Sequence, residues 1–184
     1  MLKTSALGRL SRFTRDRRGV SAVEFAFIAP VMIGLYLGCT EISDGVAADR
    51  KVSLVVDALS NLSAQVTTIS TADMTNILNA SSSIIAPYSA NNLQSTVSCL
   101  KIDANGKVTV AWSATLNGTA RSVGSSVTIP SALAVPSTQL LFSEASYAYT
   151  PIVGYTITGT LTLSDHMYMA PRITAPTYNG TACT

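Results

Sequence analysis

The residue with the clearest chemical consequence in this sequence is Glu24, because it lies inside an apolar run from Val20 to Cys39. A carboxylate placed in hydrocarbon costs about 2.5–3.5 kcal/mol on insertion scales, so such an acid is usually either paired and functional or close enough to the membrane surface to reach water. An amino group is the one cation that could be supplied at the same depth. Cutting the chain between Gly19 and Val20 would create it, since Val20 would then carry a new N-terminus.

No set of residues in the sequence predicts an enzyme. The one histidine, His166, follows Asp165 in a stretch that we predict to be a strand, and a Ser-His-Asp triad needs placed partners that the sequence does not signal. The sequence contains no G-x-S-x-G, Walker A or dinucleotide-binding motif. We therefore expect no catalysis, no cofactor and no small-molecule substrate.

The three cysteines, Cys39, Cys99 and Cys183, are too widely spaced to suggest a zinc site, and we expect no bound metal. If the domain lies outside the cytoplasm, Cys99 and Cys183 could form a disulfide. Closing so long a loop would contribute roughly 4–5 kcal/mol on the chain-entropy model. Two buried free thiols are the alternative.

Basic residues concentrate at the N-terminus. Residues 1–19 hold six basic residues and one acid, which leaves six basic and nine acidic residues of the totals of 12 and 10 over residues 20–184. A basic head that does not continue onto a folded surface argues against nucleic-acid binding. It fits a cytoplasmic topology signal beside a membrane segment.

The run from Val20 to Cys39 is long enough to cross a membrane, since a helix of this length spans about 30 Å, one hydrocarbon core. By the positive-inside rule, the N-terminus stays in the cytoplasm and the C-terminal domain is exported to the periplasm. We therefore predict a single-pass protein with membrane lipid among its partners. Gly34 and Gly38 form a small-xxx-small pair that would let helices approach closely, unless the spacing is chance.

Two other export signals compete with this interpretation. A cleaved secretory signal would have a shorter apolar region and a small-residue cleavage site, and no clear A-x-A site closes this run. A lipoprotein signal would end at Cys39, after Leu37 and Gly38. Glu24 and Pro30 inside the run argue against it.

The stretch RRGVSAVEFA, which starts at Arg17, resembles a prepilin peptidase site of the type IV-like class. It has a basic leader, a glycine before the cut, and Glu24 as the fifth residue counted from Val20, followed by the aromatic Phe25. Extended to TEI at residues 40–42, the stretch resembles TadE-like proteins of the TadE/TadG family, found in tight-adherence (Flp, type IVb) pilus systems. Because the related TadG-like proteins generally lack the glutamate in this context, Glu24 favours TadE.

The resemblance extends to the end of the chain. EASYAYTPIVG, from Glu144 to Gly154, is similar to a Y-x-Y-x-P strand near the end of these proteins. LSDHMYMAPR, from Leu163 to Arg172, resembles their terminal aromatic-x-x-Pro-Arg segment. The middle of the chain, about residues 70–140, matches only in general character.

The resemblance implies a minor pilin or pseudopilin anchored in the bacterial inner membrane and incorporated into, or placed at the base of, an extracellular pilus. It implies processing by a prepilin peptidase, with Gly19 and Val20 at the cut and Glu24 and Phe25 serving processing and assembly. The implied partners are other pilins or pseudopilins and the pilus platform. The implied roles are pilus biogenesis, surface adhesion and secretion.

Two helices are predicted after the leader. Residues 41–66 keep a helical pattern with one apolar face, so this stretch and the membrane segment could form one helix of about 40 residues or more, which Gly45 would loosen. Ser70 and Asp73 form a variant capping box that would open a second helix ending before Pro87.

From Ser95 onward the apolar pattern alternates. TVSCLKI and KVTVAWS flank Asn105-Gly106, a strong hairpin signal. Residues 121–130 would form a short strand or edge, and 139–151 and 155–169 would form two longer strands around a turn. We therefore predict a pilin-like α+β fold with a four- to five-stranded antiparallel sheet and an irregular tail.

These predictions divide the chain into a basic leader, a transmembrane assembly helix, a helical stalk with a second helix, and an exported β-rich domain, at 1–19, 20–39, 40–90 and 91–184. The favoured function is a structural subunit of the pilus. The alternative is an uncleaved single-pass binding module that recognises an envelope partner from the periplasm.

Overall fold

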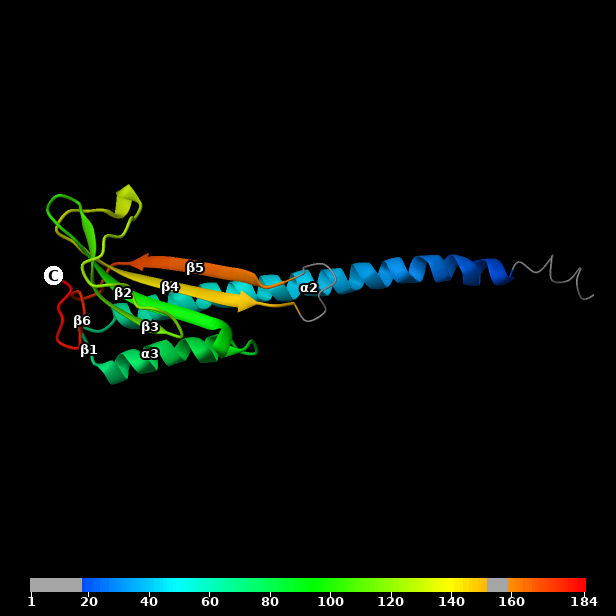
Figure 1. The fold of residues 1–184 in the computed structure, drawn as a ribbon, viewed down its shortest axis with the longest axis horizontal. Coiled ribbons are helices and arrows are strands. Elements are labelled where there is room, and N and C mark those ends of the chain that lie inside the picture. Colours follow the sequence, from blue (N-terminus) through cyan, green and yellow to red (C-terminus); the bar gives the residue numbers. More distant parts are fainter. Residues whose placement is uncertain (1–17, 152–158) are drawn as a thin grey trace, which may run out of the picture.

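The computed structural model describes residues 18–151 and 159–184. Its longest element is helix α2 (Arg18–Ala64), whose 47 residues correspond to about 70 Å. Figure 1 shows that the first half of α2 projects away from a globular domain and the second half crosses it. The membrane segment and the amphipathic stretch are therefore one helix, as predicted. It continues past both Pro30 and Gly45, and the predicted boundary between residues 39 and 40 falls inside it.

Helix α3 (Thr71–Ile84) begins at the predicted capping box. The Ser70 hydroxyl accepts a hydrogen bond from the Asp73 N–H at 3.1 Å, and the Asp73 carboxylate accepts one from the Ser70 N–H at 3.1 Å. The helix ends before Pro87, also as predicted, and it buries Met74 and Leu78.

One antiparallel sheet has the strand order β3-β2-β4-β5. Its strands are β2 (Leu93–Ile102), β3 (Val108–Leu116), β4 (Gln139–Tyr149) and β5 (Leu161–Met169). Helices α2 and α3 cover one face of the sheet (Figure 1). The α+β fold with a long first helix, a second helix and a four-stranded antiparallel sheet is therefore confirmed.

The β2–β3 hairpin turns at Asn105-Gly106, as the sequence predicts. Gly106 has a φ of 79°, a conformation that glycine adopts without steric cost. The Asp103 carboxylate accepts hydrogen bonds from the backbone N–H groups of Asn105 and Lys107, both at 2.8 Å. The turn is therefore held by a side chain that the sequence places just before it.

Two segments differ from the predictions. Residues 121–130 form no named strand. They run beside β3 with one isolated bridge, between Thr109 and Ser126, and with backbone hydrogen bonds from Gly124 to Val127 only, after a turn in which Gly124 has a φ of 81°. The predicted irregular tail contains β6 (Thr177–Tyr178), which pairs in parallel with β1 (Thr68–Ile69). Short 3₁₀ turns occupy Ala90–Asn92 and Ser131–Leu133. The predicted turn at Pro151 to Gly154 lies largely outside the described residues.

The main core lies between the helices and the sheet. Its largest fully buried side chains come from α2, α3 and the sheet and include Leu59, Met74, Leu93, Val97 and Leu141. A smaller apolar cluster lies on the other side of the sheet around Leu100, Val110 and Phe142. The apolar face predicted within residues 41–66 is therefore core packing against the domain from Val52 to Leu59. Its last two predicted members, Leu62 and Val66, are exposed.

Candidate functional site

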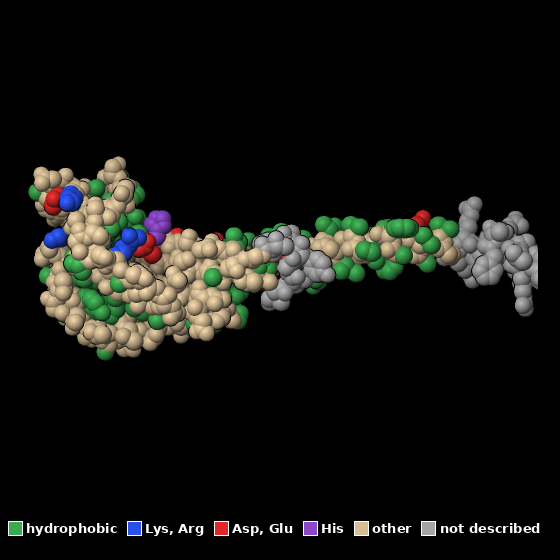
Figure 2. Space-filling view, in the orientation of Figure 1, with side chains coloured by type: hydrophobic (Ala, Val, Ile, Leu, Met, Phe, Trp, Pro, Cys, Tyr) green, Lys and Arg blue, Asp and Glu red, His purple; other side chains and the backbone are tan. Residues whose placement is uncertain are grey.

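The first half of α2 makes almost no contact with the rest of the described chain. Side chains between residues 19 and 36 are nearly all exposed, with Val20 at 52% and Phe25 at 69%. A Cβ atom built on Gly19 or Gly34 would have no neighbour within 4 Å. Figure 2 shows hydrophobic side chains around this projecting part of the helix. This surface therefore needs lipid or other helices to cover it.

This projecting helix fits a single-pass membrane protein. It is long and apolar enough to cross a membrane, the one such helix among the described residues. Its exposed part, residues 19–36, rises about 27 Å, close to the thickness of a hydrocarbon core. Exposure falls directly after this part, since Leu37 and Gly38 are half-buried.

Glu24 is the only charged residue between Val20 and Cys39. It is exposed on the projecting part of α2, one helical turn after Val20, and it makes no ion pair with any residue in the described ranges. Phe25 follows it and is also exposed. The predicted cleavage and assembly residues therefore share one accessible helical segment, and any partner of the Glu24 carboxylate in the membrane has open access to it.

A tyrosine cluster joins the helix to the base of the domain. The Tyr88 hydroxyl donates a hydrogen bond to the backbone carbonyl of Asp44 at 3.0 Å, and the Tyr149 ring lies 3.7 Å from the position of a Cβ on Gly45. The Tyr88 and Tyr147 ring centroids are 6.0 Å apart. Burial, and secondarily the Asp44 charge, raises the pKa of both Tyr88 and Tyr149. These contacts fix the direction in which the membrane helix leaves the domain.

A disulfide between Cys99 and Cys183 attaches the C-terminal tail to the sheet, with the two Cα atoms 6.0 Å apart. Both cysteines are buried. Trp112, the cross-strand neighbour of Cys99, donates its indole N–H to the Pro176 carbonyl at 3.0 Å and so holds the same tail. Cys39 is free and exposed on α2.

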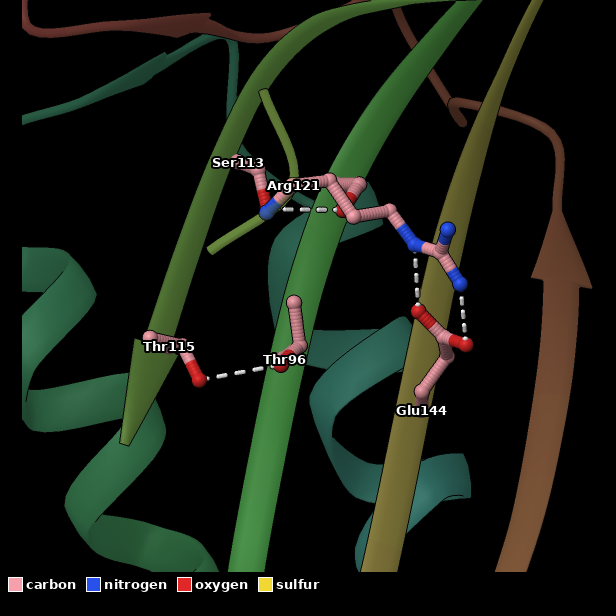
Figure 3. A network of polar contacts seen from close by, with 6 residues as sticks. Thr96, Ser113, Thr115, Arg121 and Glu144 are labelled. Atoms are coloured by element: carbon pink, nitrogen blue, oxygen red, sulfur yellow. Dashed lines mark hydrogen bonds and ion pairs between the residues drawn. The ribbon is translucent and has the colours of Figure 1, made fainter. Parts of the chain in front are cut away.

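The face of the sheet opposite the helices carries a polar network (Figure 3). The Arg121 guanidinium donates two hydrogen bonds to the Glu144 carboxylate, at 2.6 and 2.7 Å, and these bonds raise the pKa of Arg121. Its guanidinium carbon lies 5.2 Å from the centre of the Phe142 ring. The backbone N–H of Arg121 donates a hydrogen bond to the Ser113 hydroxyl at 3.1 Å. The network attaches the loop after β3 to the sheet.

His166 lies on strand β5, as the sequence predicts, with its ring near Phe142 and Tyr168. The Asp165 carboxylate accepts a hydrogen bond from the His166 backbone N–H, not from the imidazole. A shallow hollow of about 270 Å³ beside these residues is lined mainly by serine, threonine and glutamine side chains together with Glu144. Within the described ranges, no three His, Cys, Asp or Glu side chains are grouped as metal ligands.

Sequence reasoning located the long apolar helix and its acid, but it missed the Arg121–Glu144 pair. The two residues are 23 positions apart, so only their place in the fold brings them together. It also missed the hydrogen bond that the Asp165 carboxylate accepts from the His166 backbone N–H. An aspartate is unusual in the middle of a strand, so its position in the sequence could have indicated such a role. The packing role of Gly34 and Gly38 stays a prediction.

Comparison with known proteins agrees with the projecting helix. Residues 19–58 match the model of a family described as TadE-like protein. The match confirms the resemblance noted in the sequence over this segment, and it indicates a protein associated with the tight-adherence pilus. No curated protein and no solved structure matches the chain.

Proposed function

We propose, from the TadE-like character of residues 19–58, that this protein is a minor pilin or pseudopilin that supports assembly of a tight-adherence pilus. The observation that carries the proposal is the single acid, Glu24, on an exposed apolar helix with no ion-pair partner in the described chain. The proposed role is structural and involves no catalysis. The proposed partners are a prepilin peptidase, other pilins or pseudopilins, and the pilus platform in the inner membrane.

Cleavage of the leader would create a cation that can pair with the Glu24 carboxylate. Cleavage after Gly19 would remove the basic leader and leave a positive amino group on Val20. The family match also begins at Gly19, which supports a functional boundary there. The arginines before the cut would hold the N-terminus on the cytoplasmic side until processing.

Helix geometry predicts how the new amino group would pair. Glu24 lies four residues after Val20, an axial rise of about 6 Å. A neighbouring subunit displaced by about this distance along the helix axis would bring its Val20 amino group level with Glu24. The pair would neutralise a charge that is costly in hydrocarbon and would set the register between subunits.

Mass spectrometry of the N-terminus of the protein purified from membranes tests the processing step. We expect a mature chain that begins at Val20. An intact leader on fully functional protein would contradict the proposal and would favour an uncleaved membrane-anchored binding module.

Substitution of Glu24 tests the assembly step. We expect Glu24→Ala to insert into the membrane normally but to abolish pili, because no carboxylate remains to receive the amino group. Val23→Ala is the matched control, since Val23 is its exposed apolar neighbour on the same turn. Pilus number is counted by electron microscopy, and unchanged piliation in Glu24→Ala would refute the pairing role.

A further inference from the structure

The outer edge of strand β5 has no strand beside it in the described part of the chain. β5 is the last strand of the sheet, and only β4 pairs with it among the described residues. The opposite edge strand, β3, is partly covered, because the Val110 N–H donates to the Ser125 carbonyl at 3.0 Å and the Val127 N–H donates to the Val108 carbonyl at 3.2 Å. The two edges therefore differ in their capacity to pair with another chain.

One hydrogen bond shows which backbone groups face outward on β5. The His166 N–H donates to the Asp165 carboxylate at 2.8 Å, which places this N–H on the open side of the strand. In an antiparallel pair, alternate residues direct their backbone groups toward the partner strand and away from it. The N–H and C=O groups of Ser164 and Tyr168 therefore face the same open edge.

A groove beside this edge could receive the side chains of an added strand. It measures about 510 Å³ and lies between α2 and β5, which pack against each other. Leu54 from α2, 56% exposed, and the half-buried Met167 from β5 supply its apolar surface. An added strand would direct every second side chain toward the helices, as Met167 is directed, and so into the groove.

The charged side chains that line the groove favour a positively charged partner. Three carboxylates line it, from Asp49, Asp57 and Asp165, against the single guanidinium of Arg50. None of these four groups forms an ion pair with a residue in the described ranges. A second copy paired edge to edge about Asp165 would set two Asp165 carboxylates opposite each other, which is destabilising. A lysine or arginine opposite Asp165 would instead be stabilised.

We propose that the open edge of β5 binds an extended segment of another protein by strand addition, with a lysine or arginine opposite Asp165. The flanking side chains on the same face, two residues away on either side, would be apolar and lie beside Leu163 and Met167. Main-chain hydrogen bonds to β5 supply affinity and the alternate side chains supply specificity, as in other cases of strand addition. This inference does not depend on pilus assembly or on leader cleavage.

The test uses the full chain in detergent micelles and a fluorescein-labelled peptide of sequence Thr-Val-Thr-Lys-Thr-Val-Thr. Fluorescence anisotropy should show saturable binding. Replacing the peptide lysine by glutamate should weaken binding at least tenfold, and N-methylation of the peptide amides that face β5 should abolish it. Hydrogen exchange should slow at the Ser164, His166 and Tyr168 amides when the peptide is bound.

The matched variants are Asp165→Asn and Asp44→Asn. Asparagine can still accept the His166 N–H, so Asp165→Asn removes the charge and leaves the cap; we expect about tenfold weaker binding of the lysine peptide. Asp44 lies on the same helix outside the groove, and its variant should bind as the parent does. Equal binding of the lysine and glutamate peptides, unchanged binding by Asp165→Asn, or no binding to the parent chain would each overturn the proposal. The last result would mean that Asp165 only protects the edge from pairing.

Discussion

Removing the Cys99–Cys183 disulfide should destabilise the globular domain strongly, because the bond closes a long loop. The two cysteines are 84 positions apart, and the loop between them contains β3, β4 and β5. In the chain-entropy model, releasing such a loop raises the entropy of the unfolded chain by about 15 cal/mol/K, or about 4.5 kcal/mol at 25 °C. Domains are typically stable by only 5–15 kcal/mol, so this bond accounts for a large share of the expected total.

Urea unfolding of the full chain in detergent micelles measures the effect. Trp112, the one tryptophan in the sequence, is buried beside Cys99 and bonded to the tail, so its fluorescence reports the sheet and the tail together. With an m-value of about 2 kcal/mol/M, the unfolding midpoint of the Cys99→Ala/Cys183→Ala variant should fall by about 2 M. Cys39→Ala, which removes the exposed free thiol, is the control and should not change the midpoint.

The chemically reduced parent separates the cross-link from the loss of two buried sulfur atoms. It keeps both sulfurs, so most of the decrease in the midpoint should remain. If the reduced parent and the double variant unfold at the oxidised parent's midpoint with an unchanged m-value, the loop-closure reasoning is refuted. A decrease limited to tryptophan fluorescence, with unchanged far-ultraviolet circular dichroism, would also refute it, because only the tail would then have been released.

Two further predictions concern pH. The hydrogen bonds with Ser70 lower the pKa of Asp73. The stability that the ionised carboxylate contributes is therefore present above pH 3.8 and is lost as pH falls through the lowered pKa. Asp73→Asn should flatten that part of an acid-unfolding curve measured by circular dichroism. Burial raises the pKa of Tyr149, so the stability that the neutral phenol contributes is present below pH 10 and is lost as pH rises through the raised pKa. Tyr149→Phe should therefore reduce the fall in the thermal unfolding midpoint above pH 10. An unchanged slope in either variant would contradict the corresponding assignment.

The elements that follow from local sequence were predictable. The capping box of α3 depends on two residues three positions apart, and the β2–β3 hairpin depends on Asn105-Gly106 and the preceding Asp103. The apolar run and its single acid identified the membrane helix for the same reason. In each case, the residues that form the feature are close together in the sequence, so their pattern contains the information.

The features that the sequence did not predict depend on residues far apart. The parallel β1–β6 pair joins Thr68 to Thr177, and each strand is only two residues long, too short for an alternating pattern. Residues 121–130 alternate like a strand but keep only a short pairing with β3 around Ser126, because a turn at Gly124 precedes it and Val127 and Ile129 then pack on the smaller apolar cluster. Tertiary packing therefore overrode the local pattern there.

The unbroken helix that joins the projecting segment to the domain would have a consequence for the proposed assembly. The helix enters the domain at the buried Glu41, and the tyrosine cluster then fixes it through Asp44 and Gly45. The proposed pairing between Glu24 and a neighbour's amino group would set the axial position of the whole helix, and the continuous helix would carry that position into the domain. Assembly in the membrane would then determine how the globular domains are spaced, and with them the open β5 edges. A flexible insertion after Glu41 should therefore leave membrane insertion unchanged but uncouple domain spacing from helix register.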